Sequence, residues 1–303
     1  MQVITDQVYR FSKDNVACAT AEPGEVLVFK TLDCFSNRIT DETVTMASLD
    51  YGYDVANPAA GPVFVNGAKP GDVLVVDILS IDVADEGTIA TDDHCGPLFE
   101  GMPYATKKVR IEEGFAVFND LRFPIDPMIG VIGTAPSGDD VIDGYIGSHG
   151  GNMDNKLITA GARLFFPVRV EGALLQMGDV HAAMGDSEIC GTGIEIPASI
   201  TVRIALIKDF ELNWPVLETK DKWYVNACAP EYHEACRNAA RELHRLLMRA
   251  TGWSAPDTYM YMSVQCDLEI NQGCKPCAVE MSLRFGAPKH PGIKPLIDID
   301  KLL

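Results

Sequence analysis

Hydrophobic and polar positions alternate over short stretches through most of the first 220 residues, and Gly, Pro or Asp separates one stretch from the next. A period of two is typical of strands with one buried face. The clearest predicted strands cover residues 25–30, 72–79, 108–112, 115–119, 160–170, 173–177 and 189–206. Within this set, residues 163–170 and 173–178 flank a Glu-Gly turn and predict a hairpin. Strands at such regular spacing predict a mainly β fold, with a sandwich or barrel-like β body.

A different pattern begins near the end of the chain. Apolar residues between Pro230 and Ala250 fall on one stripe, which predicts a long amphipathic helix, and Gly252 follows its end. Ser254 then fits the N-cap of a second helix. Residues 278–284 alternate again and predict a closing strand. The tail is therefore predicted to have a β-helix-helix-β order.

This change of pattern predicts two parts of the molecule. Residues 1–213 form a mainly β body that carries the active site, and residues 214–303 form a smaller α/β C-terminal subdomain packed on that body. The chain has 303 residues, 47% of them hydrophobic, with 26 glycines and 18 prolines. This composition is typical of a folded, turn-rich protein and not of a disordered one.

Charge argues against two classes of partner. The chain carries 43 acidic and 25 basic residues, a formal net charge of −18. Such a field repels phosphate backbones and anionic lipid, so no nucleic acid and no membrane is expected as a partner. The N-terminus lacks the pattern of a secretory signal and no run of 18 apolar residues occurs, which predicts a cytoplasmic protein.

The nine cysteines are predicted to be reduced thiols, in keeping with that location. Cys266, Cys274 and Cys277 lie close together in the sequence, and Cys274 and Cys277 have the spacing of half a zinc or redox site. No second pair or nearby His completes it, so small buried residues near a turn are the favoured interpretation.

Candidate chemistry is concentrated between residues 147 and 190. Within these 44 residues, the two stretches 147–154 and 179–190 hold two of the six histidines, four carboxylates and an amide side chain. Each buried carboxylate or imidazole costs several kcal/mol unless it is paired, hydrogen-bonded or bound to a metal. The concentration therefore predicts an active site or a metal site.

The second half of this segment contains Asp179, His181, Asp186, Glu188 and Cys190. If the chain is extended, Asp179 shares a face with His181, and the other three share a face with one another. Histidine with two or three carboxylates suits zinc with an open position, or calcium or magnesium if oxygen ligands dominate. The alternatives are turn positions for the two aspartates and a hydrogen-bonded core imidazole for the histidine.

The first half contains two adjacent glycines, Gly150 and Gly151, whose amides could approach an oxyanion. The bend between them could bring His149 and Asp154 towards one centre, and Asn152 could donate to a carbonyl oxygen. A hairpin loop with polar caps is the structural alternative.

Several short sequence motifs together resemble those of the acetamidase/formamidase family of amide hydrolases. They lie at residues 57–65, 67–75, 128–136, 149–154 and 178–191, in order across roughly the first two thirds of the chain. The resemblance implies a mainly β, usually oligomeric enzyme that hydrolyses small aliphatic amides such as formamide or acetamide to the acid and ammonia. It also implies a bound divalent metal, and a homo-oligomer of two or more copies. The matched site positions are His149, Asn152, Asp154, His181, Asp186 and Glu188.

These observations lead to one mechanistic hypothesis. Asp154, His181 and Asp186 hold a divalent ion, with Zn²⁺ as the first choice and Ca²⁺ or Mg²⁺ as alternatives, and Glu188 carries the proton. The amides of residues 150 and 151 with Asn152 bind the substrate oxygen, and His149 is a further catalytic candidate. Three alternatives stay open: a cyclic amide (lactam) hydrolase, a non-catalytic β protein that binds a metal or small ligand, and a Cys190 nucleophile paired with His181.

Overall fold

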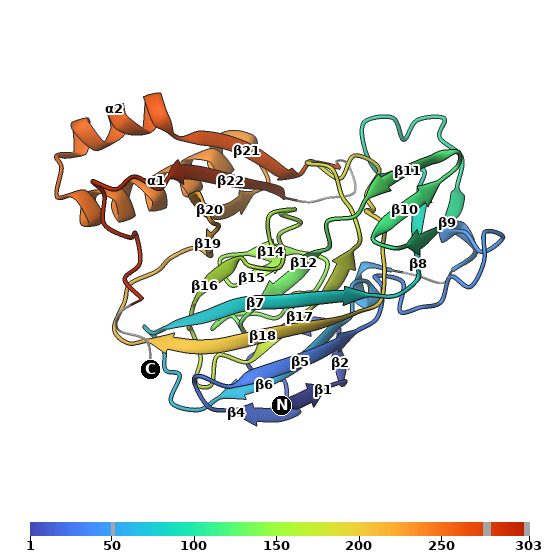
Figure 1. The fold of residues 1–303 in the computed structure, drawn as a ribbon, viewed down its shortest axis with the longest axis horizontal. Helices are drawn as coiled ribbons and strands as arrows, with labels where there is room; N and C mark the ends of the chain where they lie inside the picture. The colour runs from blue at the N-terminus through green and yellow to red at the C-terminus, as the bar shows by residue number, and fades with distance from the viewer. Residues whose placement is uncertain (50–51, 275–279, 300–303) are drawn as a thin grey trace.

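Two large β-sheets form the body of the protein (Figure 1). The computed structural model describes residues 1–49, 52–274 and 280–299. The nine-stranded sheet has the order β1 (Gln2–Ile4), β5 (Val26–Thr31), β18 (Ala198–Ile207), β7 (Val73–Val83), β16 (Arg163–Pro167), β19 (Val216–Glu218), β20 (Lys222–Ala229), β22 (Met281–Pro288), β21 (Asp267–Gln272). The seven-stranded sheet has the order β14 (Ile146–Gly147), β15 (Gly150–Asn152), β12 (Met128–Gly133), β17 (Leu175–His181), β6 (Ala59–Val65), β2 (Gln7–Val8), and β4 (Ala19–Ala21) pairs with β6.

Smaller elements complete the described structure. A four-stranded sheet has the order β11 (Leu121–Pro124), β10 (Phe115–Phe118), β9 (Ala105–Glu112), β8 (Glu86–Thr91), and β13 (Val141–Ile142) pairs with β3 (Arg10–Phe11). Two short 3-10 turns lie at Met46–Ser48 and Tyr53–Val55. The helices are α1 (Tyr232–Thr251) and α2 (Ala255–Gln265).

The main core lies between the two large sheets, as in a β-sandwich. The position of strand β7 between two cores explains why the first part of its sequence is almost continuously apolar. Leu74 and Val76 point into the sandwich core, whereas Val73 and Val75 join a second core on the opposite face. A strand that is buried on both faces needs no polar alternate positions. The expectation of a mainly β, sandwich-like body is therefore confirmed.

The second core is formed by α1, which covers the outer face of the nine-stranded sheet. Leu243, Leu246 and Leu247 of α1 pack with Trp223 and Val225 of β20. The apolar stripe of the sequence is thus the face that meets the sheet. Glycine 252, with φ of 72°, ends the helix, as its position predicted.

The predicted second helix is also confirmed, since the Ser254 side chain accepts a hydrogen bond from the Asp257 amide as an N-cap. The nine-stranded sheet continues from β16 through β19 to β22, so it crosses residue 213 without a break. Residues 214–303 share that sheet with the body, and their separation as a subdomain stays a prediction.

Two strand predictions are wrong in detail. Residues 163–170 and 173–178 do not form a hairpin, because β16 belongs to the nine-stranded sheet and β17 to the seven-stranded sheet. The connection crosses the sandwich, and Gly172, Ala173 and Leu174 all have positive φ at the bend. Residues 189–197 are not part of a strand either, and the strand begins at Ala198.

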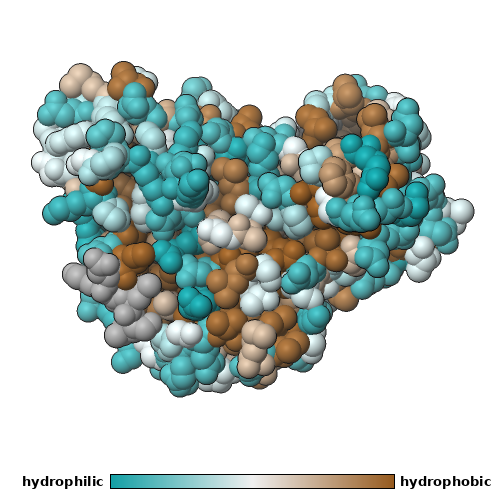
Figure 2. Space-filling view, viewed as in Figure 1, coloured by the Kyte–Doolittle hydropathy of each residue, from teal (hydrophilic) through white to brown (hydrophobic). Residues whose placement is uncertain are grey.

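The space-filling view shows two projections on either side of a hollow (Figure 2), with the helical element on one side and the four-stranded sheet on the other. Neither of the described helices is both long enough and apolar enough to cross a membrane.

We expect Leu243→Ala to lower the free energy of unfolding by about 2–5 kcal/mol, because it leaves a cavity between α1 and the sheet. Arg241→Ala on the exposed face of the same helix is the control and should change it by less than about 0.5 kcal/mol. Urea unfolding of both variants measures the difference, and equal effects would contradict this packing.

Candidate active site

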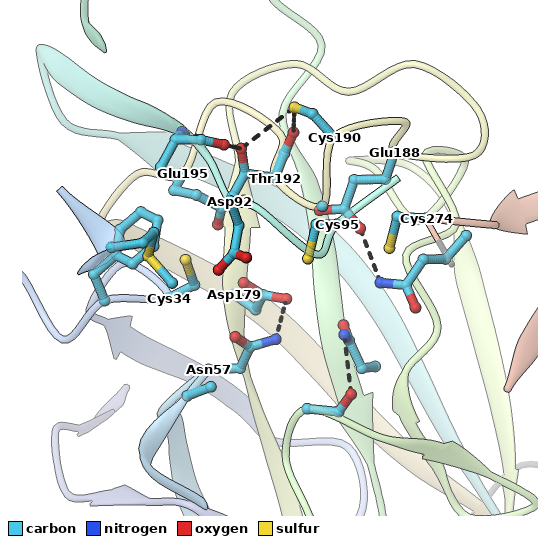
Figure 3. A pocket seen from close by; sticks show the side chains of 18 of the residues that line it. Cys34, Asn57, Asp92, Cys95, Asp179, Glu188, Cys190, Thr192, Glu195 and Cys274 are labelled. Atoms are coloured by element: carbon cyan, nitrogen blue, oxygen red, sulfur yellow. Dashed lines mark hydrogen bonds between the residues drawn. The ribbon is translucent and has the colours of Figure 1, made fainter. Parts of the chain in front are cut away.

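A cavity of about 180 Å³ opens where loops from both ends of the chain meet the end of β17 (Figure 3). Its apolar wall includes Phe35, Met46, Ala56 and Ala90. Its polar wall includes side chains from distant parts of the sequence: Asn57, Asp92, His94, Asn152, Asp179, Glu188, Thr192, Glu195, Gln272. A space of this size with one polar and one apolar wall suits a small polar organic molecule.

Four carboxylates surround one imidazole behind this polar wall. His181 Nε2 lies 3.0 Å from Glu195 Oε1, 3.6 Å from Asp179 Oδ1 and 4.0 Å from Glu188 Oε1. Ligand atoms of Asp154, His181 and Glu188 all lie within 4.8 Å of one another. All five side chains are buried. We call Asp154, Asp179, His181, Glu188 and Glu195 the carboxylate cluster.

Unusual backbone conformations direct three of these carboxylates inward. Asp154, Asp179 and Glu188 have φ values of 42°, 55° and 47°. Left-handed backbone costs a residue with a side chain of order 1–3 kcal/mol, so it persists only where the surroundings enforce it. Such strain is typical of functional sites.

Gly130 on β12 provides the space in which two carboxylates lie. A Cβ atom at Gly130 would be 2.5 Å from Asp154 Oδ1 and 2.7 Å from Asp179 Oδ2. Gly193 has a matching role beside the imidazole, since its Cβ would be 2.7 Å from His181 Cγ. The two glycines therefore act through their lack of a side chain.

Two amide side chains donate to the cluster. Gln272, at the end of β21, donates through Nε2 to Asp154 Oδ2 at 2.5 Å and to Glu188 Oε2 at 2.8 Å. Asn57 donates through Nδ2 to Asp179 Oδ2 at 3.0 Å. These neutral donors satisfy some oxygen atoms but bring no positive charge.

The electrostatics of the cluster reflect this lack of cations. Burial raises the pKa of Glu195 to about 8, and burial with the neighbouring Glu188 raises the pKa of Asp154 well above its usual value. Burial alone would lower the pKa of His181, but Glu195 and Asp179 outweigh it and raise that pKa. Within the described parts of the chain, no Lys or Arg pairs with any of the four carboxylates.

The donor set fits a divalent metal ion. Asp154 Oδ1, Glu195 Oε2 and both ring nitrogens of His181 are buried and have no well-aligned hydrogen-bond partner. Unpaired polar atoms at such depth are costly, and a cation can satisfy carboxylate oxygens together with one of the two ring nitrogens. Imidazole with carboxylates is a set that Zn²⁺ accepts.

The structure places Asp186 outside this cluster. Its carboxylate is bidentate with Arg284, at 2.8 Å on both oxygens, and lies 2.9 Å from Lys156 Nζ. These cations lower the pKa of Asp186 although its partial burial opposes them. The turn at Ser187 and Glu188, both at positive φ, replaces the expected extended chain, so Asp186 does not share a face with Glu188.

Gly150 and Gly151 also lie away from the cavity wall. Both are residues of β15, which pairs with β12 on one side and β14 on the other. A Cβ at Gly150 would lie 2.3 Å from the Ile132 carbonyl oxygen, so the position requires glycine for close strand contact. The geometry gives their amides no visible role towards an oxyanion.

Asn152 does line the cavity. Its Nδ2 donates to the Gly144 carbonyl oxygen at 3.4 Å, and its Oδ1 is buried without a partner. The residue thus presents an unused hydrogen-bond acceptor to the space.

His149 is not brought into the cluster. Its ring packs edge-on against Phe11, with 4.7 Å between ring centroids, and its Nε2 has no hydrogen-bond partner. Burial lowers the pKa of His149 to about 3, so the ring is neutral at neutral pH.

Comparison with known proteins identifies the family of the chain. The model of the acetamidase/formamidase family matches residues 3–145 and 141–281. The chain belongs to the acetamidase/formamidase family. The resemblance to this family that the sequence motifs indicated is therefore confirmed.

Solved structures of related proteins share the fold across the chain. The acetamidase of Bacillus halodurans has a TM-score of 0.90 at 36% identity, and the match covers 94% of this chain and 97% of that one. A predicted acetamidase/formamidase of Thermoanaerobacter tengcongensis has a TM-score of 0.89 at 37% identity, covering 95% of each chain. A putative formamidase of Schizosaccharomyces pombe is 27% identical, and the match covers 66% of this chain and 64% of the relative.

Sequence reasoning missed several residues of this family member's site. Glu195 carried a usable signal, since it is a carboxylate between Ile194 and Ile196. Gln272 carried none, because it reaches the site from the last third of the chain. Cys34 also faces the cavity, from a loop whose purpose the sequence left open.

The cysteines differ in part from the prediction. Cys95 lines the cavity and is disulfide-bonded, so the expectation of nine free thiols is wrong for it. Cys266 is a partly buried thiol and Cys274 is buried, which agrees with the structural interpretation for Cys274. Cys277 lies outside the described residues.

Gly130→Ala should lower the free energy of unfolding by about 1–3 kcal/mol, because its methyl group would displace the Asp154 and Asp179 carboxylates. Gly138→Ala is the matched control, since a Cβ at Gly138 meets nothing within 4 Å. Chemical unfolding compares the two, and equal stability would show that the carboxylates are free to move.

His149→Phe should weaken the pH dependence of stability on the acid side. As pH falls below the ordinary value of 6.5, the unfolded chain takes up a proton that the folded protein refuses until about pH 3, so wild-type stability falls by up to about 1.4 kcal/mol per pH unit from this residue alone. Urea unfolding between pH 7 and 5 should show a shallower slope in the variant. His233→Gln at an exposed position should keep the wild-type slope, and an unchanged slope in His149→Phe would refute the assignment.

Proposed function

We propose that this protein hydrolyses small linear amides to the carboxylic acid and ammonia with the help of a divalent metal ion. The observation that carries the proposal is the carboxylate cluster, with its unpaired buried atoms, behind a cavity of about 180 Å³. Family membership and the names of the relatives, formamidase and acetamidase, support the reaction class. A homo-oligomeric state, a cytoplasmic location and the choice of Zn²⁺ over Ca²⁺ or Mg²⁺ belong to the same proposal.

The residues that would hold the ion are Asp154, His181 and Asp179. Asp179 takes the place that the sequence assigned to Asp186, because the Asp179 carboxylate lies beside His181 whereas Asp186 is neutralised by Arg284. A divalent ion there supplies Lewis-acid polarisation of the amide carbonyl and lowers the pKa of a water molecule.

Glu188 has the position of a proton carrier. It lines the cavity, whereas Asp154 and His181 lie behind the wall. Burial raises its pKa above the ordinary value, which favours the uptake of a proton. Gln272 fixes one oxygen, and the other faces His181 and is available to the reacting water. The leaving nitrogen of an amide must be protonated, so the same residue serves both steps.

Asn152 has the position of a substrate anchor. Asn152 lines the cavity and its Oδ1 lacks a partner, so this oxygen can accept a hydrogen bond from the N–H of a primary amide. A site that hydrogen-bonds a substrate N–H strongly rejects molecules that lack it. The apolar wall at Phe35 and Ala90 then contacts the acyl group, and the small volume favours short acyl groups.

Ammonia release from formamide, acetamide, propionamide and a small lactam tests the reaction class. The linear amides should react, turnover should disappear with a chelator, and added Zn²⁺ should restore it. Release that survives verified metal removal would refute the metal requirement, and hydrolysis of the lactam alone would favour the cyclic-amide alternative. If none of these substrates is hydrolysed, the alternative of a non-catalytic protein that binds a metal or small ligand would be favoured.

Two substitutions separate metal binding from proton transfer. Glu188→Gln should retain the metal, measured by elemental analysis, and lose turnover by about 10²–10⁴-fold, which is the usual worth of a general acid–base. Asp154→Asn should lose both metal and turnover. Glu100→Gln, at an exposed position, is the control. Loss of metal from Glu188→Gln would make Glu188 a ligand and not the proton carrier.

A further inference from the structure

We propose that the cavity has a second cation site, formed by Cys34, Asp179 and Glu195, which takes a thiophilic divalent ion such as Zn²⁺ beside the first. Asp179 is shared by the two sites, so the pair would be a two-metal centre with a bridging carboxylate. The inference extends the proposed metal-dependent function, and its test measures metal binding and not turnover.

The geometry groups the three residues. One ligand atom of each lies within 4.8 Å of the corresponding atoms of the other two, and all three residues are buried. They come from three separate segments: the loop after β5, the end of β17 and the loop before β18. Figure 3 shows Cys34 and Asp179 on the same side of the cavity, with Glu195 above them.

The loop that presents Cys34 is held rigidly. Asp33 and Asn37 exchange two hydrogen bonds, at 3.0 Å and 2.6 Å, between backbone N–H groups and side-chain oxygens. The Cys34 carbonyl accepts from the Asn57 amide at 3.1 Å. Because Asn57 also donates to Asp179, the thiol and the carboxylate are positioned by one shared residue.

Glu195 provides an independent indication of a ligand. Its Oε1 accepts from the Gly193 amide at 2.8 Å, but its Oε2 is buried and has no hydrogen-bond partner. Only 1% of the residue is exposed, so water from outside does not solvate that oxygen. An unpaired carboxylate oxygen at this depth is expected to meet a cation.

Charge balance favours two ions over one. The carboxylate cluster carries four negative charges when ionised, and the described chain supplies no Lys or Arg to pair with them. One divalent ion would leave two of these buried charges uncompensated, each with a penalty of several kcal/mol. Two divalent ions would balance the four carboxylates, and the Cys34 thiolate would leave the centre with one net negative charge.

The donor chemistry indicates which ion the second site takes. A thiolate with carboxylates suits Zn²⁺ or Co²⁺, whereas Mg²⁺ and Ca²⁺ prefer oxygen ligands alone. Cys34 would therefore lose its proton to the solvent when the ion binds, as ligating thiols do.

Titration of metal-depleted full-length protein with Co²⁺ tests the proposal, with elemental analysis of the Zn²⁺ form. The expected result is two equivalents of metal per chain and a near-ultraviolet thiolate-to-Co²⁺ charge-transfer band. Cys34→Ser should bind one equivalent fewer and lose the band, while Asp154→Asn should lose the other equivalent and keep the band. Cys190→Ser, which removes a different cavity-lining thiol, should keep both features.

A thermal melt of each variant shows whether it is folded, and Cys34→Ala provides a second substitution if the serine variant does not fold. Binding of a single equivalent by wild-type protein would overturn the two-site arrangement, with or without the band. Retention of the band in folded Cys34→Ser would overturn the assignment of the ligand. Amide turnover with one bound equivalent would leave the proposed function intact and remove only this inference.

Discussion

The concentration of buried negative charge around His181 is the constraint on which the rest of the site depends. Four carboxylates approach one imidazole with no Lys or Arg beside them in the described chain, and burial raises the pKa of Asp154, Glu188 and Glu195. Such a group is unstable in isolation, because each buried charge costs several kcal/mol. It becomes stable when cations or protons neutralise it, and this is the property that a metal-dependent hydrolase uses.

The fold opposes this instability by holding the cluster from several sides. Gly130 and Gly193 leave the space in which carboxylates and imidazole lie. Gln272 donates hydrogen bonds to both Asp154 and Glu188 from β21, a C-terminal strand of the nine-stranded sheet. The other side of the cluster comes from β17, which belongs to the seven-stranded sheet. The site is thus built between the two sheets of the sandwich, and the C-terminal segment contributes to it directly. Because the nine-stranded sheet includes the C-terminal strands, it also carries Gln272 to the site.

The cavity beside the carboxylate cluster has a polar wall and an apolar wall. The cluster and the Asn152 side chain form a polar wall that suits the amide group, while Phe35 and Ala90 form an apolar wall that suits a short acyl chain. Cys34 lies near the carboxylates, so the candidate metal ligands and the candidate substrate contacts share one small space. Positive φ at three of the carboxylates shows that the backbone accepts strain to keep this arrangement.

The sequence by itself determined the class of fold, both helices with the end of the first and the start of the second, and the segments that hold His181, Asp154 and Glu188. Helix and strand periodicity and clusters of polar residues are local signals. Only the tertiary structure decided which side chains face one another. Asp186 and Arg284 are 98 residues apart, and their ion pair removes from the site a carboxylate that looked equivalent to Glu188. Gly150 and Gly151 would look the same in a sequence whether they bind an oxyanion or, as here, allow close strand contact. Gln272 and Glu195 reach the cluster through contacts between distant segments, which no local pattern encodes.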